Sequence, residues 1–313
     1  MFKDKILNRK EGILLYGLTP PKQDSTPEKL AEIADKQIQR INALPIDGLI
    51  LYDIQDEASR TNIERPFPYM ATLDPQEYRE QYLRGCRVAS INYKCVGKHT
   101  PDTFVKWLQQ PVSGDTCSVF VGAASREQSV SLSMKQAYQL KKQYNNELVV
   151  GGVTIPERHI KKGDEHLRIF DKMQSGCQFF ISQCVYHLEA SKDLISDLYY
   201  HAADNGLPLV PVIFTLTPCG SLKTLQFMEW LGISIPRWLK NDLARSGDIL
   251  NKSIDICKSI AEELMAFCHE KNIPAGFNIE SIAIRKAEID ASVELLHFVK
   301  GLFQDQQSSL FKT

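Results

Sequence analysis

The chain has 313 residues, of which 43% are hydrophobic and 24% are charged, and its formal net charge at pH 7 is −1. A chain of this length can bury a large core, as one large domain or two small ones. The balanced charge argues against the basic surface of a nucleic-acid-binding protein, so no nucleic-acid partner is expected.

No apolar run approaches the length of a membrane span, and the first ten residues lack the apolar core of a signal peptide. The eight cysteines are scattered without a Cys-x-x-Cys pair, and several lie inside apolar runs. Such cysteines are typical of buried thiols in a reducing compartment. We therefore expect a cytoplasmic protein with no membrane partner. The seven histidines are dispersed, and no metal site is expected.

Short apolar runs alternate along the chain with stretches that carry apolar residues at the helical spacing i, i+3 and i+4. Eight runs are predicted strands, at residues 12–18, 48–52, 88–92, 117–122, 148–153, 179–183, 209–214 and 275–280. Predicted helices lie at residues 27–44, 101–110, 131–144, 164–175, 190–205, 221–230 and 247–271. The first helix has a start signal, with Thr26 as the N-cap and Pro27 at the first helical position.

The predicted strands are continuous apolar runs, which favours a parallel sheet covered by helices. Eight β-α repeats predict an α/β protein with a single (β/α)₈ TIM barrel over residues 1–303. An open doubly wound sheet is the alternative, but no Gly-x-Gly-x-x-Gly follows the first strand. The polar residues 304–313 are predicted to form a flexible tail. In a barrel, the site lies at the carboxyl ends of the strands.

Three segments in the second half of the chain carry motifs. They read Pro-Glu-Arg-His at 156–159, Gly-Cys-Gln-Phe-Phe-Ile-Ser-Gln at 176–183 and Ser-Ile-Pro-Arg-Trp at 234–238. They resemble the Pro-Glu-x-His, Gly-Ala-x-x-x-Ile-Thr-Gln and Arg-Ile-Pro-x-Trp motifs of the methylenetetrahydrofolate reductase family, in the same order. The resemblance is clearest from residue 149 to residue 280. It implies a flavin- and folate-dependent oxidoreductase of one-carbon metabolism and methionine biosynthesis, with FAD as cofactor and NAD(P)H as electron donor.

The resemblance also implies roles for individual residues. Gln183 falls on the family glutamine that faces the pterin, and Phe227 on the phenylalanine that packs beside the folate. The positions that the resemblance assigns to FAD are His159, Glu165, Arg168 and Lys172, together with Asn92, Gly122, Ala123 and Ala124 near the ends of the third and fourth strands.

Four positions depart from the family pattern. Gly17 stands where the family has the glutamate that acts as general acid, and Ala124 stands where it has an aspartate beside the flavin. Asp171 replaces an arginine, and Asn92 replaces a histidine. A positioned general acid contributes about 10²–10⁴-fold in rate. Either the chemistry has changed, or another group in this chain supplies the proton.

Two carboxylates are candidates for that role. Asp53 is the first residue after the second predicted strand, although the acidic stretch there is also typical of a solvated loop. Glu280 closes the eighth predicted strand, where partial burial would raise its pKa; the alternative is a salt bridge with Arg285.

The departures leave other functions open. One is a flavin-independent folate reductase, or a folate methyltransferase of the same fold. Another is a subunit without catalysis of its own that binds folate or flavin and works with a partner protein or as a homo-oligomer. In each case Gln183 and Phe227 point to a ligand of the tetrahydrofolate class.

Overall fold

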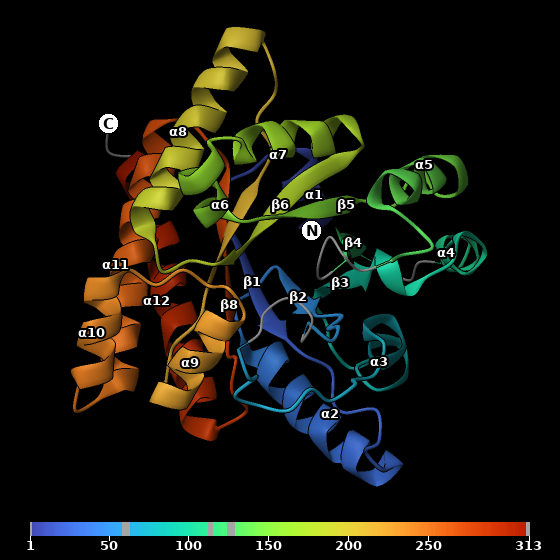
Figure 1. Ribbon diagram of the computed structural model, residues 1–313, viewed down its shortest axis with the longest axis horizontal. Coiled ribbons are helices and arrows are strands. Elements are labelled where there is room, and N and C mark those ends of the chain that lie inside the picture. Colours follow the sequence, from blue (N-terminus) through green and yellow to red (C-terminus); the bar gives the residue numbers. More distant parts are fainter. Residues whose placement is uncertain (1, 58–62, 112–114, 124–128, 311–313) are drawn as a thin grey trace.

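Eight parallel strands close into a barrel in chain order, which confirms the predicted (β/α)₈ fold (Figure 1). The computed structural model describes all residues except 1, 58–62, 112–114, 124–128 and 311–313. The strands are β1 (Ile13–Leu18), β2 (Gly48–Leu51), β3 (Ala89–Cys95), β4 (Thr116–Val121), β5 (Val150–Thr154), β6 (Cys177–Cys184), β7 (Val212–Leu216) and β8 (Ala275–Glu280).

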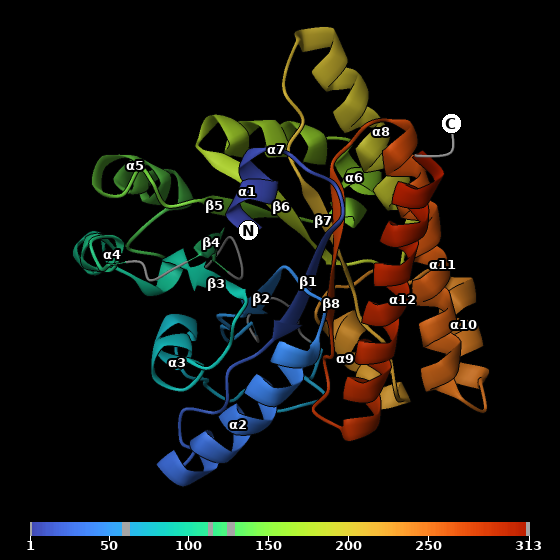
Figure 2. The ribbon, with the colours of Figure 1, turned by 180° about the vertical axis from the view of Figure 1, so that it is seen from behind.

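Helices surround the strands on the outside, as both views of the ribbon show (Figure 2). Those at predicted places are α2 (Pro27–Ala43), α4 (Pro101–Leu108), α5 (Met134–Tyr144), α7 (Glu165–Gln174), α8 (Leu188–Asn205), α9 (Leu222–Trp230) and α11 (Ile249–Glu270). The sequence did not predict α1 (Phe2–Leu7), α3 (Pro75–Gln81), the short 3₁₀ helix η2 (Val96–Lys98), α6 (Pro156–Lys162), α10 (Arg237–Arg245) or α12 (Lys286–Leu310).

The last helix corrects the predicted boundary at residue 303. Helix α12 continues to Leu310, so residues 304–310 are helical and do not begin a flexible tail. Phe303 is buried against the ring of Phe277 in β8, with ring centres 6.1 Å apart. This contact holds the helix on the barrel at the point where the sequence turns polar.

A compact apolar cluster fills the inside of the barrel, and α1 closes its amino-terminal end. Phe2 is 2% exposed, and its ring meets that of Phe179 edge-on at 6.0 Å. Its backbone N–H donates to Asp115 Oδ2 at 2.9 Å, which anchors the helix. Gly151 makes room for Phe179, because a Cβ there would lie 2.6 Å from the ring. This glycine therefore relieves packing inside the barrel.

The cysteines behave as the sequence predicted. All eight are free and buried. Among the described residues, no helix combines the length and apolar character that crossing a bilayer requires.

The packing around Gly151 can be tested by substitution. Gly151→Ala should destabilise the protein by about 1–3 kcal/mol, because the added methyl group forces Phe179 out of its place. Gly247→Ala is the matched control, since a Cβ there meets nothing within 4 Å. Urea unfolding followed by circular dichroism measures both. Equal stability of the two variants would contradict this packing of the barrel interior.

Candidate functional site

Tyr52 fills the space at the barrel mouth that opens above Gly17. A Cβ at Gly17 would lie 3.0 Å from both Cε2 and Oη of Tyr52 and 3.2 Å from Asn278 Oδ1. The Tyr52 hydroxyl accepts a hydrogen bond from Asn278 Nδ2 at 2.9 Å, and its ring meets Tyr93 edge-on with centres 4.8 Å apart. A larger residue at position 17 would therefore require Tyr52 to shift by a few tenths of an ångström.

Glu280 lies beside the same gap. It is the register partner of Gly17 in the β1–β8 pair, so the two residues sit side by side on adjacent strands. Burial raises the pKa of Glu280 to about 7, although hydrogen bonding by Tyr52 and Asn278 opposes the shift. This confirms the predicted rise in pKa. The proposed salt bridge with Arg285 is wrong, because Arg285 pairs with Glu288 at 2.8 Å.

Asp53 is engaged in structural contacts. Its Oδ2 accepts from the backbone N–H of Cys95 at 2.7 Å, and its Oδ1 pairs with Lys98. Its side chain is only 7% exposed. Both carboxylate oxygens are therefore taken by contacts within the chain. Glu280 is therefore the better candidate for the acid.

Gln183 contacts the end of α9, the helix that carries Phe227. Gln183 closes the inward face of β6, and its Nε2 donates to the carbonyl of Leu231 at 3.0 Å. Leu231 is the C-cap of α9, and its N–H bonds to the carbonyl of Phe227 at 2.8 Å. The amide of Gln183 thus satisfies a loop carbonyl while lying at the mouth.

An arginine that the sequence did not single out lies among aromatic rings beside Phe227. The Arg65 guanidinium is 5.4 Å from the ring centre of Phe227, 4.7 Å from that of Trp230 and 5.4 Å from that of Tyr69. Phe67 meets Phe227 edge-on at 5.2 Å. Arg65 Nε and Nη1 are buried without a hydrogen-bond partner among the described residues. No helical or strand periodicity marks this loop, so sequence patterns gave no signal for it.

The family's flavin positions on α7 make contacts within the chain. Glu165 is 0% exposed, and it accepts from Thr154 Oγ1 at 3.2 Å and from the N–H of Ile155 at 2.9 Å. Lys172 Nζ donates to the carbonyl of Val153 at 2.5 Å. The contacts of Glu165 and Lys172 tie α7 to the end of β5. Arg168 lies 3.4 Å from Asp164, the N-cap of α7.

The other flavin positions are dispersed. Asn92 was predicted to end its strand, but β3 continues to Cys95, and Asn92 points to the helix side. There it lines a small polar cavity with Arg79 and Trp107. The Gly122 carbonyl accepts from Gln55 Nε2 at 3.1 Å, and Ala123 follows it, half-buried, after β4. Ala124 lies outside the described residues.

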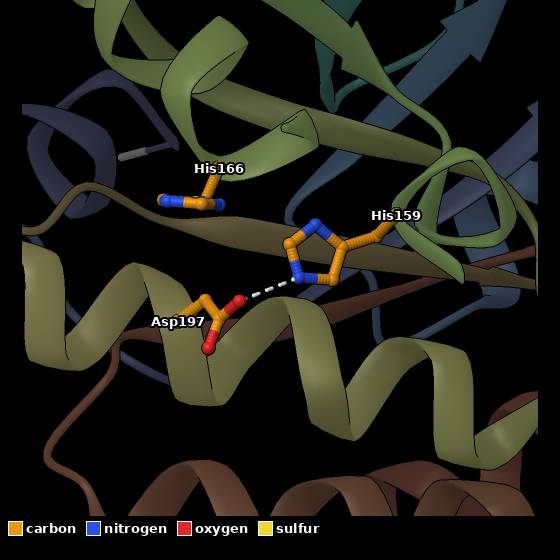
Figure 3. A group of neighbouring side chains, drawn as sticks. All are labelled: His159, His166 and Asp197. Atoms are coloured by element: carbon orange, nitrogen blue, oxygen red, sulfur yellow. Dashed lines mark hydrogen bonds and ion pairs between the residues drawn. The ribbon is translucent and has the colours of Figure 1, made fainter. Parts of the chain in front are cut away.

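His159 is also turned toward a partner within the chain. It is buried, and its Nε2 lies 2.9 Å from Asp197 Oδ2 on α8 (Figure 3). Glu165, Lys172 and Asn92 are likewise committed to contacts or positions away from a common pocket. In this structure these positions contact other residues of the chain and do not line one shared pocket.

Glu157 is a second carboxylate with a raised pKa. It lies near the start of α6, it is 8% exposed, and neither carboxylate oxygen has a hydrogen-bond partner among the described residues. Burial raises its pKa to about 7, with Glu165 adding to the effect. Glu157 belongs to the Pro-Glu-Arg-His motif at 156–159, but no sequence pattern indicated that its carboxylate would be buried without a hydrogen-bond partner among the described residues.

Comparisons with known proteins point to one family. Residues 119–278 match the family model for methylenetetrahydrofolate reductase. A structure from Clostridium thermocellum, described as a protein that binds two copies of 5-methyl-5,6,7,8-tetrahydrofolic acid, is 53% identical with a TM-score of 0.87, over 96% of this chain and 100% of that one.

Other solved structures are much less similar. A 2,3-dimethylmalate lyase is 13% identical with a TM-score of 0.40, over 99% of this chain and 97% of that one. The spore cortex-lytic enzyme SleL of Bacillus megaterium is 10% identical with a TM-score of 0.45, over 93% of this chain and 74% of that one. No curated protein matches the chain.

The isolation of Glu157 makes stability depend on pH. Because its pKa is raised in the folded state, the folded state binds the proton more tightly than the unfolded state, and stability falls as pH rises from 4.5 to about 7. Glu157→Gln should be more stable than wild type at pH 8 by about 2–3 kcal/mol, with the gain shrinking toward pH 5. Urea unfolding at several pH values measures this, with the exposed Glu147→Gln as control. The same gain at pH 5 and pH 8 would contradict it.

Proposed function

This chain belongs to the methylenetetrahydrofolate reductase family, and we propose that it binds a reduced folate of the methyl-tetrahydrofolate class at the mouth of its barrel. The proposal places the pterin between the end of β6 and the floor formed by Tyr52 and Glu280. In this proposal Glu280 protonates the pterin. Family members carry out this step with a glutamate at the position that Gly17 occupies here.

Two observations support the ligand class. The relative from Clostridium thermocellum, at 53% identity, is described as binding 5-methyl-tetrahydrofolate. In this chain Gln183 donates a hydrogen bond to the carbonyl of Leu231, and the N–H of Leu231 donates to the carbonyl of Phe227. A glutamine amide can donate to and accept from a pterin edge, and a phenylalanine ring offers it a stacking face.

The single observation that carries the chemical proposal is that Glu280 lies beside Gly17, on the adjacent strand and at the same level of the barrel. With a pKa of about 7, its carboxyl group is protonated in a large fraction of molecules at neutral pH, as a general acid requires. Donation of that proton to a pterin nitrogen turns the nitrogen into a better leaving group for its one-carbon substituent.

Transfer of the one-carbon unit fits this arrangement better than flavin-dependent reduction. The acid is retained in a new place, whereas the described flavin positions are taken by contacts within the chain. Methyl transfer from a folate needs the acid and a nucleophilic co-substrate that accepts the methyl group, but no electron donor, so neither FAD nor NAD(P)H enters the proposal. A flavin spectrum in the purified protein would instead support the reductase.

Arg65 is the residue we assign to the carboxylates of the folate tail. Its Nε and Nη1 lack partners among the described residues, and an arginine offers paired donors that match a carboxylate. The rings of Phe227 and Trp230 beside it suit the aromatic ring that joins the pterin to the glutamate. In this proposal the rings of the cluster contact the aromatic half of the folate tail, and the Arg65 guanidinium binds its carboxylates.

Gln183→Ala should weaken binding of 5-methyl-tetrahydrofolate by roughly 5- to 150-fold, because a buried polar contact contributes about 1–3 kcal/mol. Phe227→Ala should weaken it by roughly 5-fold through lost ring stacking, about 1 kcal/mol. Isothermal titration calorimetry measures both. Gln178→Ala is the control, since Gln178 lies at the opposite end of β6. Unchanged affinity in Gln183→Ala, or no binding by wild type, would refute the folate proposal.

The role of Glu280 predicts a pH dependence. If the ligand binds the protonated carboxyl group, affinity should fall by about tenfold for each pH unit above about 7, with proton uptake on binding. Glu280→Gln should bind with no such dependence, because its amide does not titrate. Calorimetry in buffers of different ionisation enthalpy measures the proton uptake. A Glu280→Gln variant with the wild-type pH profile would exclude Glu280 as the donor.

A further inference from the structure

Two histidines and an aspartate from three different helices meet in the outer helix layer. His159 lies on α6, His166 on α7 and Asp197 on α8, and one candidate ligand atom from each lies within 4.8 Å of the other two. Figure 3 shows the Asp197 side chain directed toward the two imidazoles. In the part of the chain that the structure describes, no other group of three or more His, Cys, Asp or Glu side chains has this spacing.

The atoms of this group lie close to the arrangement of metal ligands. His159 Nε2 and Asp197 Oδ2 are 2.9 Å apart. Two tetrahedral ligands that each lie about 2.0–2.2 Å from one ion are themselves about 3.3–3.6 Å apart, so this pair needs to open by only about 0.5 Å to admit an ion. The ligand atom of His166 needs a shift of about 1–2 Å to complete a three-ligand set. His166 is only partly buried, and its ring can turn.

The second observation is an unsatisfied ring nitrogen in the cluster. Nδ1 of His166 is buried and has no hydrogen-bond partner among the described residues. Buried polar atoms are normally paired, and an orphaned one calls for an explanation.

We propose that His159, His166 and Asp197 bind a divalent transition-metal ion of the zinc type. Two imidazoles and one carboxylate suit Zn²⁺ and its first-row neighbours, whereas Mg²⁺ and Ca²⁺ require mostly oxygen ligands. Asp197 is 54% exposed, which gives the ion a path from solvent and leaves room for a water ligand. The proposal does not depend on the folate site.

The bound ion would cross-link three separate helices. Helices α6 and α7 are short, with 7 and 10 residues, and Gly163 and Asp164 join them. Both pack against the longer α8. An ion held by one side chain from each helix binds only the folded state, so it stabilises that state by mass action. The site therefore acts as a clamp on the outer layer next to the end of β5.

The experiment uses the full chain without a histidine tag, after treatment with a chelator. Zn²⁺ affinity and stoichiometry are measured by competition with a chromophoric chelator, and Co²⁺ is added to read the ligand field from its visible absorption. The variants are His166→Ala and Asp197→Asn. His269→Ala is the matched control, because His269 pairs with Glu11 at 3.5 Å without a second histidine. Mg²⁺ replaces Zn²⁺ as the control for the metal.

Wild type and His269→Ala should bind one Zn²⁺ per chain, and both variants of the cluster should bind at least about tenfold more weakly. Saturating Zn²⁺ should raise the Tm of wild type on the order of 5 °C, and it should not raise that of Asp197→Asn. If His166→Ala does not fold, Asp197→Asn decides, because it preserves the shape of a half-exposed side chain. No Zn²⁺ binding by wild type, or equal binding by wild type and Asp197→Asn, would overturn the proposal.

Discussion

The alternation of side chains along the barrel strands decides which residues reach the mouth. Successive side chains of a strand point to opposite sides, so a residue belongs either to the barrel interior or to the helix layer. Ile91 and Tyr93 lie in the interior cluster, and Asn92 between them faces the helices. By the same rule, Gly17 and Glu280 share the interior face at one level. The position of the acid follows from this constraint.

Much of this architecture could be predicted from the sequence, because long apolar runs and helical spacing are strong local signals. The positions of the site residues were harder to predict. The third strand was predicted to end at Asn92, but it runs on to Cys95, so the end of the run was not the end of the strand. The polar residues after Phe303 were predicted as a tail, although a helix that is anchored earlier can continue through polar residues to Leu310.

Contacts between distant segments were beyond the reach of sequence patterns. Arg65 and Trp230 come from a loop and from α9, and only the fold brings them together. His159 and Asp197 lie on different helices, and their pairing depends on how α6 packs on α8. The resemblance to a family gave a role to His159 by position alone. It could not show that its ring nitrogen is held by a carboxylate on another helix.

The packing of Tyr52 against Gly17 also restricts how this chain can change by mutation. A glutamate at position 17 would place its Cβ 3.0 Å from the tyrosine ring and hydroxyl, so Tyr52 would have to shift by a few tenths of an ångström. A smaller residue at position 52 would relieve this contact, but it would remove the hydroxyl that Asn278 contacts. The effects of substitutions at positions 17 and 52 are therefore expected to be non-additive.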